Sequence, residues 1–276
     1  MIPQANILDW RAKAPWKTAN QVEQDLIISR ALVELFSQKV VAENLAFRGG
    51  TALHKLHLAP AARYSEDIDL VQVGDGQTDR IIDVVRQALG FLGEPLPEWR
   101  GGVATAVRQT ANLLGRGVRT LTWRFQSETP PTTRLRLKLE INTRERFNVL
   151  GLKKSPFAVD SDWFRGQCDL TTYHVDELLG TKMRAQYQRT KGRDLFDLWY
   201  GLTFGKADPA KMVDVFRRYL KEENKQVSQR QFRDDLAAKV KNPDYLADTE
   251  DLLRPGLDYN YEEAHRFVDE HLMGML

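Results

Sequence analysis

One segment in the first third of the chain constrains the fold more than any other. Residues 45–50 (LAFRGG) have the pattern of a short strand that ends at two glycines, and residues 51–58 (TALHKLHL) that of a short helix closed by Pro60. Residues 66–73 (EDIDLVQV) follow with the pattern of a second strand. The order strand, glycine turn, short helix and strand predicts a turn with free backbone N–H groups beside an acidic strand.

The two glycines, Gly49 and Gly50, suit a turn that approaches a phosphate group. Glycine lets the backbone come close to a ligand, and the N-terminus of the next helix offers unpaired N–H groups and the positive end of the helix dipole. Thr51 adds a hydroxyl group. A glycine pair alone is most often only a turn, so the prediction of a phosphate site depends on the acidic strand that follows.

Asp67 and Asp69 stand two residues apart on this strand, so both carboxylates project from the same face, while Ile68 and Leu70 enter the core. Two carboxylates on one face suit Mg²⁺ or Mn²⁺, which prefer carboxylate and phosphate oxygens. On its own, such a pair can be a solvated sheet edge. Together with the glycine turn, it predicts a metal site next to a phosphate site.

A third carboxylate, Glu140, lies on a later strand. Residues 118–127 and 133–142 are predicted strands, and the second one alternates between two faces. Its apolar face holds Leu135, Leu137, Leu139 and Ile141, and its polar face holds Arg136, Lys138, Glu140 and Asn142. Three carboxylates can hold two metal ions that clamp a phosphoryl displacement. The alternative is that Glu140 only pairs with a basic residue across the strands.

Most of the remaining pattern is helical. We expect one amphipathic helix over residues 20–45 and another over residues 78–91, and a helical region from Cys168 almost to the end of the chain. This region contains a helix pair hinged at Gly192 and three further helices that begin near Pro209, Ser228 and Tyr259.

These elements predict an α/β (α+β) fold: a small mixed sheet with flanking helices, followed by a helical C-terminal region. We expect a core domain with its N-terminal helix over residues 1–170. A helical domain over residues 171–276 is expected to complete the active site.

Composition limits the class of protein. Hydrophobic residues make up 42% and the formal net charge is +2, so any nucleic-acid contact must come from local basic clusters. Cys168 is the one cysteine, which rules out an intramolecular disulfide and favours a reducing cytoplasm. No signal-peptide pattern and no run of eighteen apolar residues is found, so we expect a soluble cytoplasmic protein without membrane contact.

At these residues the sequence resembles the nucleotidyltransferase superfamily, with its G-[GS] and D-x-D motifs. More narrowly, GGTALHKLHLAPAARYSEDIDL (49–70) is similar to the first motif of the AbiEii/AbiGii toxins of type IV toxin–antitoxin systems. KLEIN (138–142) resembles that family's strand with the third carboxylate. ELLGTKMRAQYQRTKGRDLFDLW (177–199) resembles its helical lysine and the Asp-x-x-Asp helix that follows.

The resemblance implies a role for each matching residue. Gly49, Gly50 and Thr51 would hold the nucleotide phosphates, with Ser65 helping to shape the pocket. Asp67 and Asp69 would bind the metals and Glu140 would be a third metal ligand. The downstream motifs imply that Lys182 contacts the triphosphate and that Asp194 and Asp197 order the site. From the residues alone, a solvated helix flank is the more usual place for Lys182, Asp194 is favoured by the helix dipole in the first turn after Gly192, and Asp197 can pair with Arg193.

The implied reaction is transfer of a nucleoside monophosphate from an NTP to an acceptor. The resemblance suggests a tRNA 3′ end as the acceptor, toxin activity, and a cognate antitoxin that need not bind directly. Basic groups able to contact RNA are Arg116 and Arg119, Arg134 to Lys138, Lys153 and Lys154, and Lys182 to Arg193. Lys55 and Arg63 either touch substrate or lie on the surface. Two alternatives stay open: a nucleotidyltransferase that modifies a protein or a small molecule such as an aminoglycoside, and a catalytically silent binding module.

Overall fold

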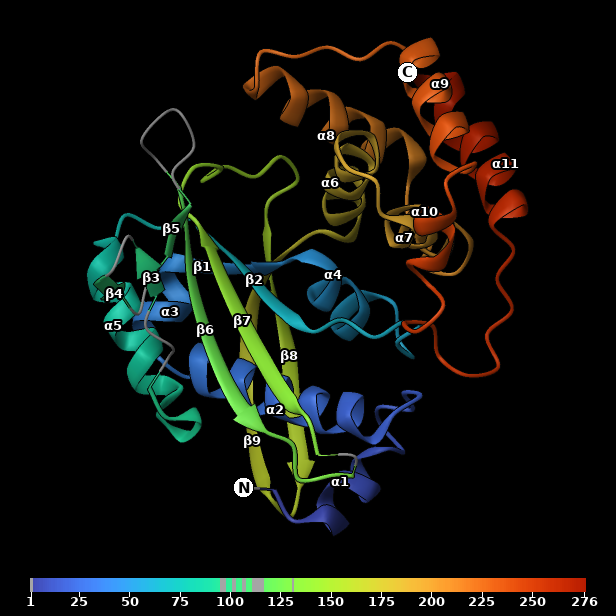
Figure 1. Cartoon of the computed structure of the whole chain (residues 1–276). Coiled ribbons are helices and arrows are strands. Elements are labelled where there is room, and N and C mark those ends of the chain that lie inside the picture. The colour runs from blue at the N-terminus through green and yellow to red at the C-terminus, as the bar shows by residue number, and fades with distance from the viewer. Residues whose placement is uncertain (1, 95–97, 101–102, 106–107, 111–116, 131) are drawn as a thin grey trace. The chain divides into compact units, whose positions relative to one another are not determined.

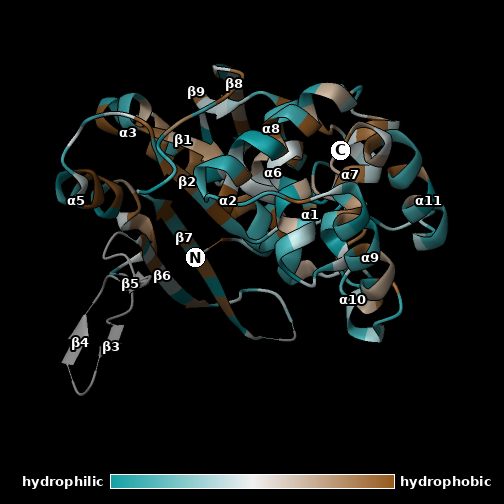
Figure 2. Ribbon diagram, turned by 90° about the horizontal axis from the view of Figure 1, so that it is seen from above, coloured by the Kyte–Doolittle hydropathy of each residue, from teal (hydrophilic) through white to brown (hydrophobic). Residues whose placement is uncertain are grey.

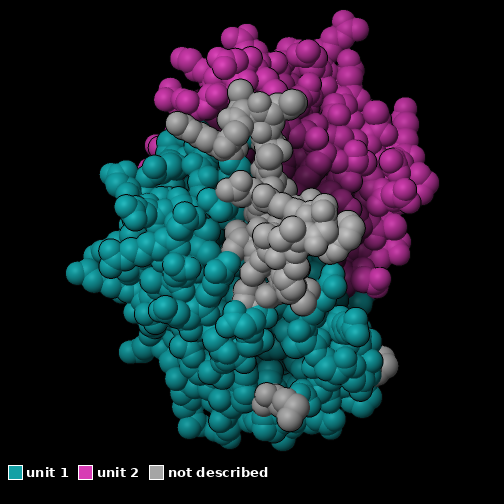
Figure 3. Space-filling model, turned by 60° about the vertical axis from the view of Figure 1, so that its left-hand side comes forward, with its two compact units in different colours: residues 1–56, 64–147, 152–172 teal, residues 57–63, 148–151, 173–276 magenta. Residues whose placement is uncertain are grey.

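A computed structural model gives the fold of the chain and describes all residues except 1, 95–97, 101–102, 106–107, 111–116 and 131. The chain divides into two compact units, coloured separately in Figure 3. Unit 1 comprises residues 1–56, 64–147 and 152–172, and unit 2 comprises residues 57–63, 148–151 and 173–276. The main boundary lies close to the predicted one at residue 170. The two short segments that belong to unit 2 have no counterpart in the prediction.

Unit 1 is built on a mixed sheet (Figure 1). Its strands, in order across the sheet, are β5 (Arg108–Thr110), β6 (Val118–Gln126), β7 (Arg134–Asn142), β2 (Asp67–Gln72), β1 (Leu45–Arg48), β9 (Phe164–Tyr173) and β8 (Leu152–Ser161). β2 runs parallel to β7 and antiparallel to β1, while β6 is antiparallel to β7. A separate two-stranded sheet contains β3 (Glu98–Arg100) and β4 (Val103–Thr105). The predicted mixed sheet is confirmed.

The two faces of the central strands differ in chemistry. Ile68 and Leu70 of β2 and Leu139 of β7 are at most 1% exposed, and they belong to the apolar core whose strands appear brown in Figure 2. On the opposite face, Asp67 and Asp69 of β2 and Lys138 and Glu140 of β7 are polar and partly buried. The alternation read from the sequence therefore places every carboxylate of the predicted metal site on one face.

The helices of unit 1 are α1 (Gln4–Trp10), α2 (Ala19–Phe36), α3 (Lys39–Asn44), α4 (Gly49–Ala52) and α5 (Thr78–Ala88), and a π-helical turn (Leu53–His57) follows α4. α2 packs against β7 and β8 and is buried along most of its length. Thr18 starts it with a capping box in which the Thr18 and Gln21 side chains bond to each other's backbone N–H groups. The prediction of one helix over residues 20–45 is wrong, because the chain turns at Gln38, whose backbone is extended, and starts again as α3.

From Val175 on, unit 2 is helical, as predicted. The predicted start of the helical region at Cys168 is wrong, because residues 164–173 form strand β9. Unit 2 contains α6 (Val175–Gln188), α7 (Gly192–Thr203), α8 (Pro209–Glu222), α9 (Gln229–Lys239), α10 (Pro243–Ala247) and α11 (Tyr261–Leu272). The predicted helix pair is α6 and α7. A Cβ atom on Gly192, the first residue of α7, would lie 2.0 Å from the carbonyl oxygen of Tyr245, so only glycine fits there. Within the described residues, no helix is long and apolar enough to cross a membrane.

Candidate active site

Gly49 joins β1 to α4 and lies directly against Asp69. Its φ is +79°, a conformation that residues with a side chain rarely adopt. A Cβ atom at this position would lie 2.1 Å from Oδ2 of Asp69, well inside contact distance. The glycine is therefore required twice, by its backbone angle and by the carboxylate packed against it. This contact brings the predicted phosphate turn and the predicted metal strand together within unit 1.

Thr51 and Ser65 connect the turn to the acidic strand. The buried Thr51 hydroxyl donates to the carbonyl oxygen of Asp67 over 2.6 Å and lies 2.9 Å from the Ser65 hydroxyl. These bonds hold the start of α4 against the start of β2. The Thr51 side chain thus has a structural partner already, and its backbone N–H is the part of it that is suited to a phosphate.

The sheet register sets the neighbours of the two aspartates. Asp67 is opposite Lys138 and Asp69 is opposite Glu140 on the parallel strand β7. The Lys138 ammonium lies 3.0 Å from Oδ2 of Asp67 and 3.5 Å from Oε2 of Glu140. Thr120 of β6 donates its hydroxyl to Oε1 of Glu140 over 3.3 Å. Glu140 does contact a basic residue, but Lys138 lies two positions away on the same strand. The cross-strand neighbours of Glu140 are Asp69 and Thr120, so the basic cross-strand partner considered from the sequence is wrong.

Asp67 and Asp69 have the properties of cation ligands. Oδ1 of Asp67 is buried and has no hydrogen-bond partner among the described residues. Burial raises the pKa of Asp69, and the neighbouring Asp67 and Glu140 carboxylates raise it further. A carboxylate crowded by like charges and a buried oxygen without a partner both favour a bound cation. The pair therefore fits a divalent metal ion.

Glu140 stands apart from the pair in one respect. Among the residues that the structure describes, no group of three or more His, Cys, Asp and Glu side chains is arranged to hold a metal ion. Lys138 lies between Asp67 and Glu140 instead. Direct metal ligation by Glu140 therefore stays a prediction.

In unit 2 the three downstream residues form one buried cluster. The Lys182 ammonium of α6 lies 3.1 Å from Oδ1 of Asp194 and 2.9 Å from Oδ2 of Asp197, both on α7. Both aspartates are fully buried. Burial alone would raise the pKa of Asp194, but Lys182 and the Arg189 guanidinium hold that pKa below its ordinary value. The solvated helix flank considered from the sequence is wrong for this cluster.

Arg63 is the fourth residue of this cluster. The sequence did not predict that it belongs there. Its guanidinium donates two hydrogen bonds of 2.7 Å to the two oxygens of Asp197, and its side chain is 1% exposed. Burial opposes its charge, yet Asp197 keeps the pKa of Arg63 above the ordinary value. Neither of the roles considered for Arg63, substrate contact or a surface position, fits this burial. The one feature of the sequence that pointed to Arg63 was its place in the same motif as Asp67, residues 49–70.

Lys55 is also held inside the protein, in unit 1. Its ammonium lies 2.9 Å from Oδ2 of Asp25. The same carboxylate accepts a hydrogen bond from the indole N–H of Trp10 on Oδ1 and one from that of Trp16 on Oδ2. Lys55 therefore fixes the helix that follows the glycine turn to α2.

The predicted basic groups have different surroundings. All those between Lys182 and Arg193 are paired with carboxylates: Lys182 and Arg189 with Asp194, Arg184 with Glu223, and Lys191 and Arg193 with Asp248. Arg119 pairs with Asp79, and Arg116 lies outside the described residues. By contrast, Arg134 and Arg136 are exposed on β7, on the face that carries Glu140, and Arg124 of β6 is opposite Arg136.

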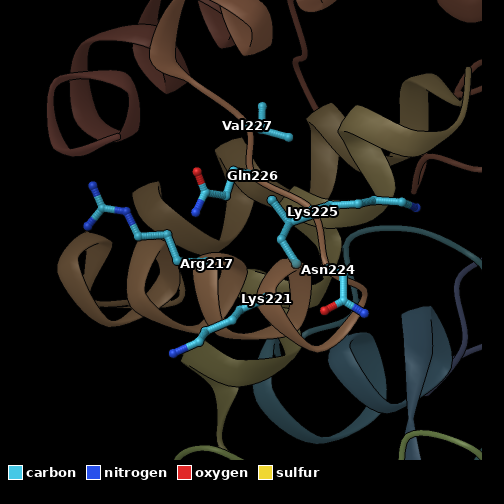
Figure 4. Close-up of a pocket in the computed structure, with 7 residues that line it drawn as sticks. Arg217, Lys221, Asn224, Lys225, Gln226 and Val227 are labelled. Atoms are coloured by element: carbon cyan, nitrogen blue, oxygen red, sulfur yellow. The ribbon is translucent and has the colours of Figure 1, made fainter.

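A cavity of about 840 Å³ lies at the end of α8 in unit 2 (Figure 4). It is lined by Arg217, Leu220, Lys221, Asn224, Lys225, Gln226 and Val227, and none of these residues was predicted to be functional. Figure 4 shows the Arg217 and Lys221 side chains extending from one helix. The predicted site residues are not part of this cavity.

Comparison with known proteins identifies the family. The family model described as nucleotidyl transferase AbiEii toxin, type IV toxin–antitoxin system, matches residues 30–267. The chain belongs to the AbiEii family. The match covers more of the chain than the motifs predicted, including α8, α9 and α10. A search of curated proteins finds no match.

Solved structures share the fold of this AbiEii-family protein. MenT4, a nucleotidyltransferase toxin from Mycobacterium tuberculosis H37Rv, is similar over 100% of this chain and 91% of its own, with a TM-score of 0.65 and 20% identity. JHP933 from Helicobacter pylori is similar over 92% of this chain and 90% of its own, with a TM-score of 0.53 and 17% identity. Family membership makes the chain a nucleotidyltransferase toxin of a type IV toxin–antitoxin system, which implies a cognate antitoxin and an NTP substrate.

Proposed function

We propose that this protein transfers a nucleoside monophosphate from an NTP to an RNA 3′ end, with a tRNA as the acceptor, and that this transfer makes it toxic. The observation that carries the proposal is the face of β2 and β7 in unit 1. There, Gly49 packs against Asp69, and Asp67, Asp69 and Glu140 project from one side of the sheet. A backbone turn and clustered carboxylates are the parts that nucleotidyl transfer requires.

Asp67 and Asp69 are the proposed holders of Mg²⁺ or Mn²⁺. A divalent ion bound there would supply charge stabilisation to the α-phosphate and lower the pKa of the acceptor hydroxyl. The backbone N–H groups of Gly49, Gly50 and Thr51 are positioned at the start of a helix, where they can donate to phosphate oxygens. Ser65 supports this turn through Thr51.

Lys182 is the proposed contact of the triphosphate. An ammonium group has three N–H donors, and Asp194 and Asp197 occupy two of them, which leaves one for a phosphate oxygen. The same two carboxylates fix the direction of the side chain. Asp194 and Asp197 therefore act in the proposal by orienting Lys182.

An RNA acceptor is supported by the exposed arginines of unit 1. Arg124 of β6 and Arg134 and Arg136 of β7 make no ion pair with the described residues, and they lie on the face of these two strands that carries Glu140. Unpaired guanidinium groups are suited to phosphodiester oxygens. A protein or aminoglycoside acceptor would not need such a row of positive charge. The cytoplasm, where tRNA is found, is the proposed location.

The test is incubation of the protein with each α-labelled NTP, Mg²⁺ and total RNA, followed by separation of RNA, protein and small molecules. We expect label at the 3′ end of tRNA, and none with Asp69→Asn. The matched control is Asp160→Asn, an exposed acid on β8 that pairs with Arg165, which should transfer label normally. If the label is found in protein or in a small molecule, the acceptor is that molecule and not RNA. The absence of label in every fraction would contradict transfer itself.

A further inference from the structure

Lys138 has a position that neither the motifs nor the family description assigns. It lies on β7 directly opposite Asp67, two residues before Glu140, so the sheet register forces its side chain onto the face with the three carboxylates. Its neighbours in sequence, Leu137 and Leu139, are both fully buried, which fixes the strand in this orientation. A lysine at this register is held beside the predicted metal site by the fold itself.

The carboxylate oxygens divide into two sets around it. Oδ2 of Asp67 and Oε2 of Glu140 face the Lys138 ammonium at 3.0 Å and 3.5 Å, and Oε1 of Glu140 accepts from Thr120. The other set is Oδ1 of Asp67, which is buried without a partner among the described residues, and the Asp69 carboxylate packed on Gly49. Only the second set is available to a metal ion without displacing a bond that already exists.

The charges agree with this division. Asp67, Asp69 and Glu140 carry three negative charges and Lys138 carries one positive charge, which leaves two negative charges. The Arg48 guanidinium also acts on Asp69, but its charge is balanced by Glu145, which lies 3.0 Å away. One divalent cation balances the two remaining negative charges. A second divalent cation between Asp67 and Glu140 would lie within a few ångströms of the ammonium, and at that separation the two positive centres repel each other strongly.

We propose that Lys138 takes the place of a second metal ion: its ammonium bridges Asp67 and Glu140, so that the site binds one divalent cation, through Asp67 and Asp69. Glu140 then holds Lys138 and is not a metal ligand. In this role Lys138 is a positioning residue that sets how many cations the site takes. The inference rests on the proposed function, because it concerns the same metal site.

Binding of Mn²⁺ alone, without nucleotide, tests the inference. Free Mn²⁺ is measured by electron paramagnetic resonance while the wild type, Lys138→Met, Lys138→Arg and Lys13→Met are titrated. We expect one ion per chain for the wild type. Lys138→Met should bind a second ion, or bind the first about tenfold or more tightly, because a positive charge near the site is removed. Lys138→Arg, which keeps the charge, should behave like the wild type.

Lys13→Met is the matched control, because it makes the same chemical change at an exposed lysine of unit 1. Lys13 contacts the backbone oxygen of Asp160 and, among the residues that the structure describes, no carboxylate. It should leave Mn²⁺ binding unchanged. The inference is overturned if the wild type binds two ions or none, if Lys138→Met changes neither number nor affinity, or if Lys138→Arg behaves like Lys138→Met. None of these outcomes depends on nucleotide transfer, so failure of the inference and failure of the proposed function are separate results.

Discussion

The two acidic clusters of this protein are built in opposite ways. On the face of β2 and β7 in unit 1, three carboxylates lie near one ammonium, which contacts two of them, and one buried oxygen has no partner in the described structure. Inside unit 2, two carboxylates face the three cations of Lys182, Arg63 and Arg189. In the first cluster negative charges outnumber positive ones, and in the second cluster positive charges outnumber negative ones. Aspartates from one set of motifs therefore lie in two different electrostatic environments, one that favours a further cation and one whose negative charge is already neutralised.

The largest effect should come from breaking the second cluster. Asp197→Asn leaves the buried Arg63 and Lys182 short of one negative charge, and removal of one partner of a buried pair costs about 3–5 kcal/mol. Urea unfolding measures this as a lower free energy of unfolding. Asp234→Asn in α9, which breaks an exposed pair with Arg230, should change it by less than about 1 kcal/mol. If the two substitutions lower the free energy of unfolding equally, the buried cluster stabilises unit 2 no more than an exposed ion pair does.

A smaller effect is expected at the glycine turn of the first cluster. Gly49→Ala and Gly256→Ala both place a side chain at a φ near +80°, but an added Cβ meets Asp69 only at Gly49 and has open space at Gly256. Both variants should lose about 1 kcal/mol from backbone strain, and Gly49→Ala about 1–3 kcal/mol more. Nucleotide transfer should fall only in Gly49→Ala. If the two alanine variants unfold at the same urea concentration, the contact between the added Cβ and Asp69 does not lower the free energy of unfolding.

The smallest effect should be a gain in stability in the first cluster. Burial and the neighbouring carboxylates raise the folded-state pKa of Asp69 above its unfolded-state value. The folded wild type therefore loses stability as the pH rises through the interval between these two values. Asp69→Asn does not titrate, so the metal-free variant should melt about 1–3 °C higher than the metal-free wild type at neutral pH.

The gain should vanish at a pH below both pKa values, where Asp69 is protonated in either state. Thermal melts in a chelating buffer across this pH range provide the measurement. A variant that is less stable than the wild type at neutral pH would mean that the Asp69 charge is compensated in the folded protein, and the contrast between the clusters would disappear.

Much of the first cluster could be predicted from sequence because strands alternate. Two-residue spacing places Asp67 with Asp69, and Lys138 with Glu140, on common faces whatever the rest of the chain does. What the spacing does not give is the register between strands. Only the parallel pairing of β2 with β7 sets Lys138 opposite Asp67, and no local pattern selects that partner.

The second cluster was less accessible to sequence reasoning. The helix pair α6 and α7 and its three charged residues were found, but Arg63 lies 134 positions away from Asp197 along the chain. A buried arginine has no periodic signal of its own. Strands β8 and β9 were missed for a related reason: many of their residues are exposed, and Pro156 interrupts the pattern in β8.

The place of β2 in the sheet has a consequence for how the site behaves in time. With three strands on each side, β2 is the middle strand. Asp69 is paired with Arg48 of β1 and with Glu140 of β7, and Asp67 is paired with Lys138 of β7. Amide hydrogens in such a strand exchange with solvent only when the whole unit opens. The two aspartates are thus carried by backbone that fluctuates least, so their geometry is present before any substrate arrives.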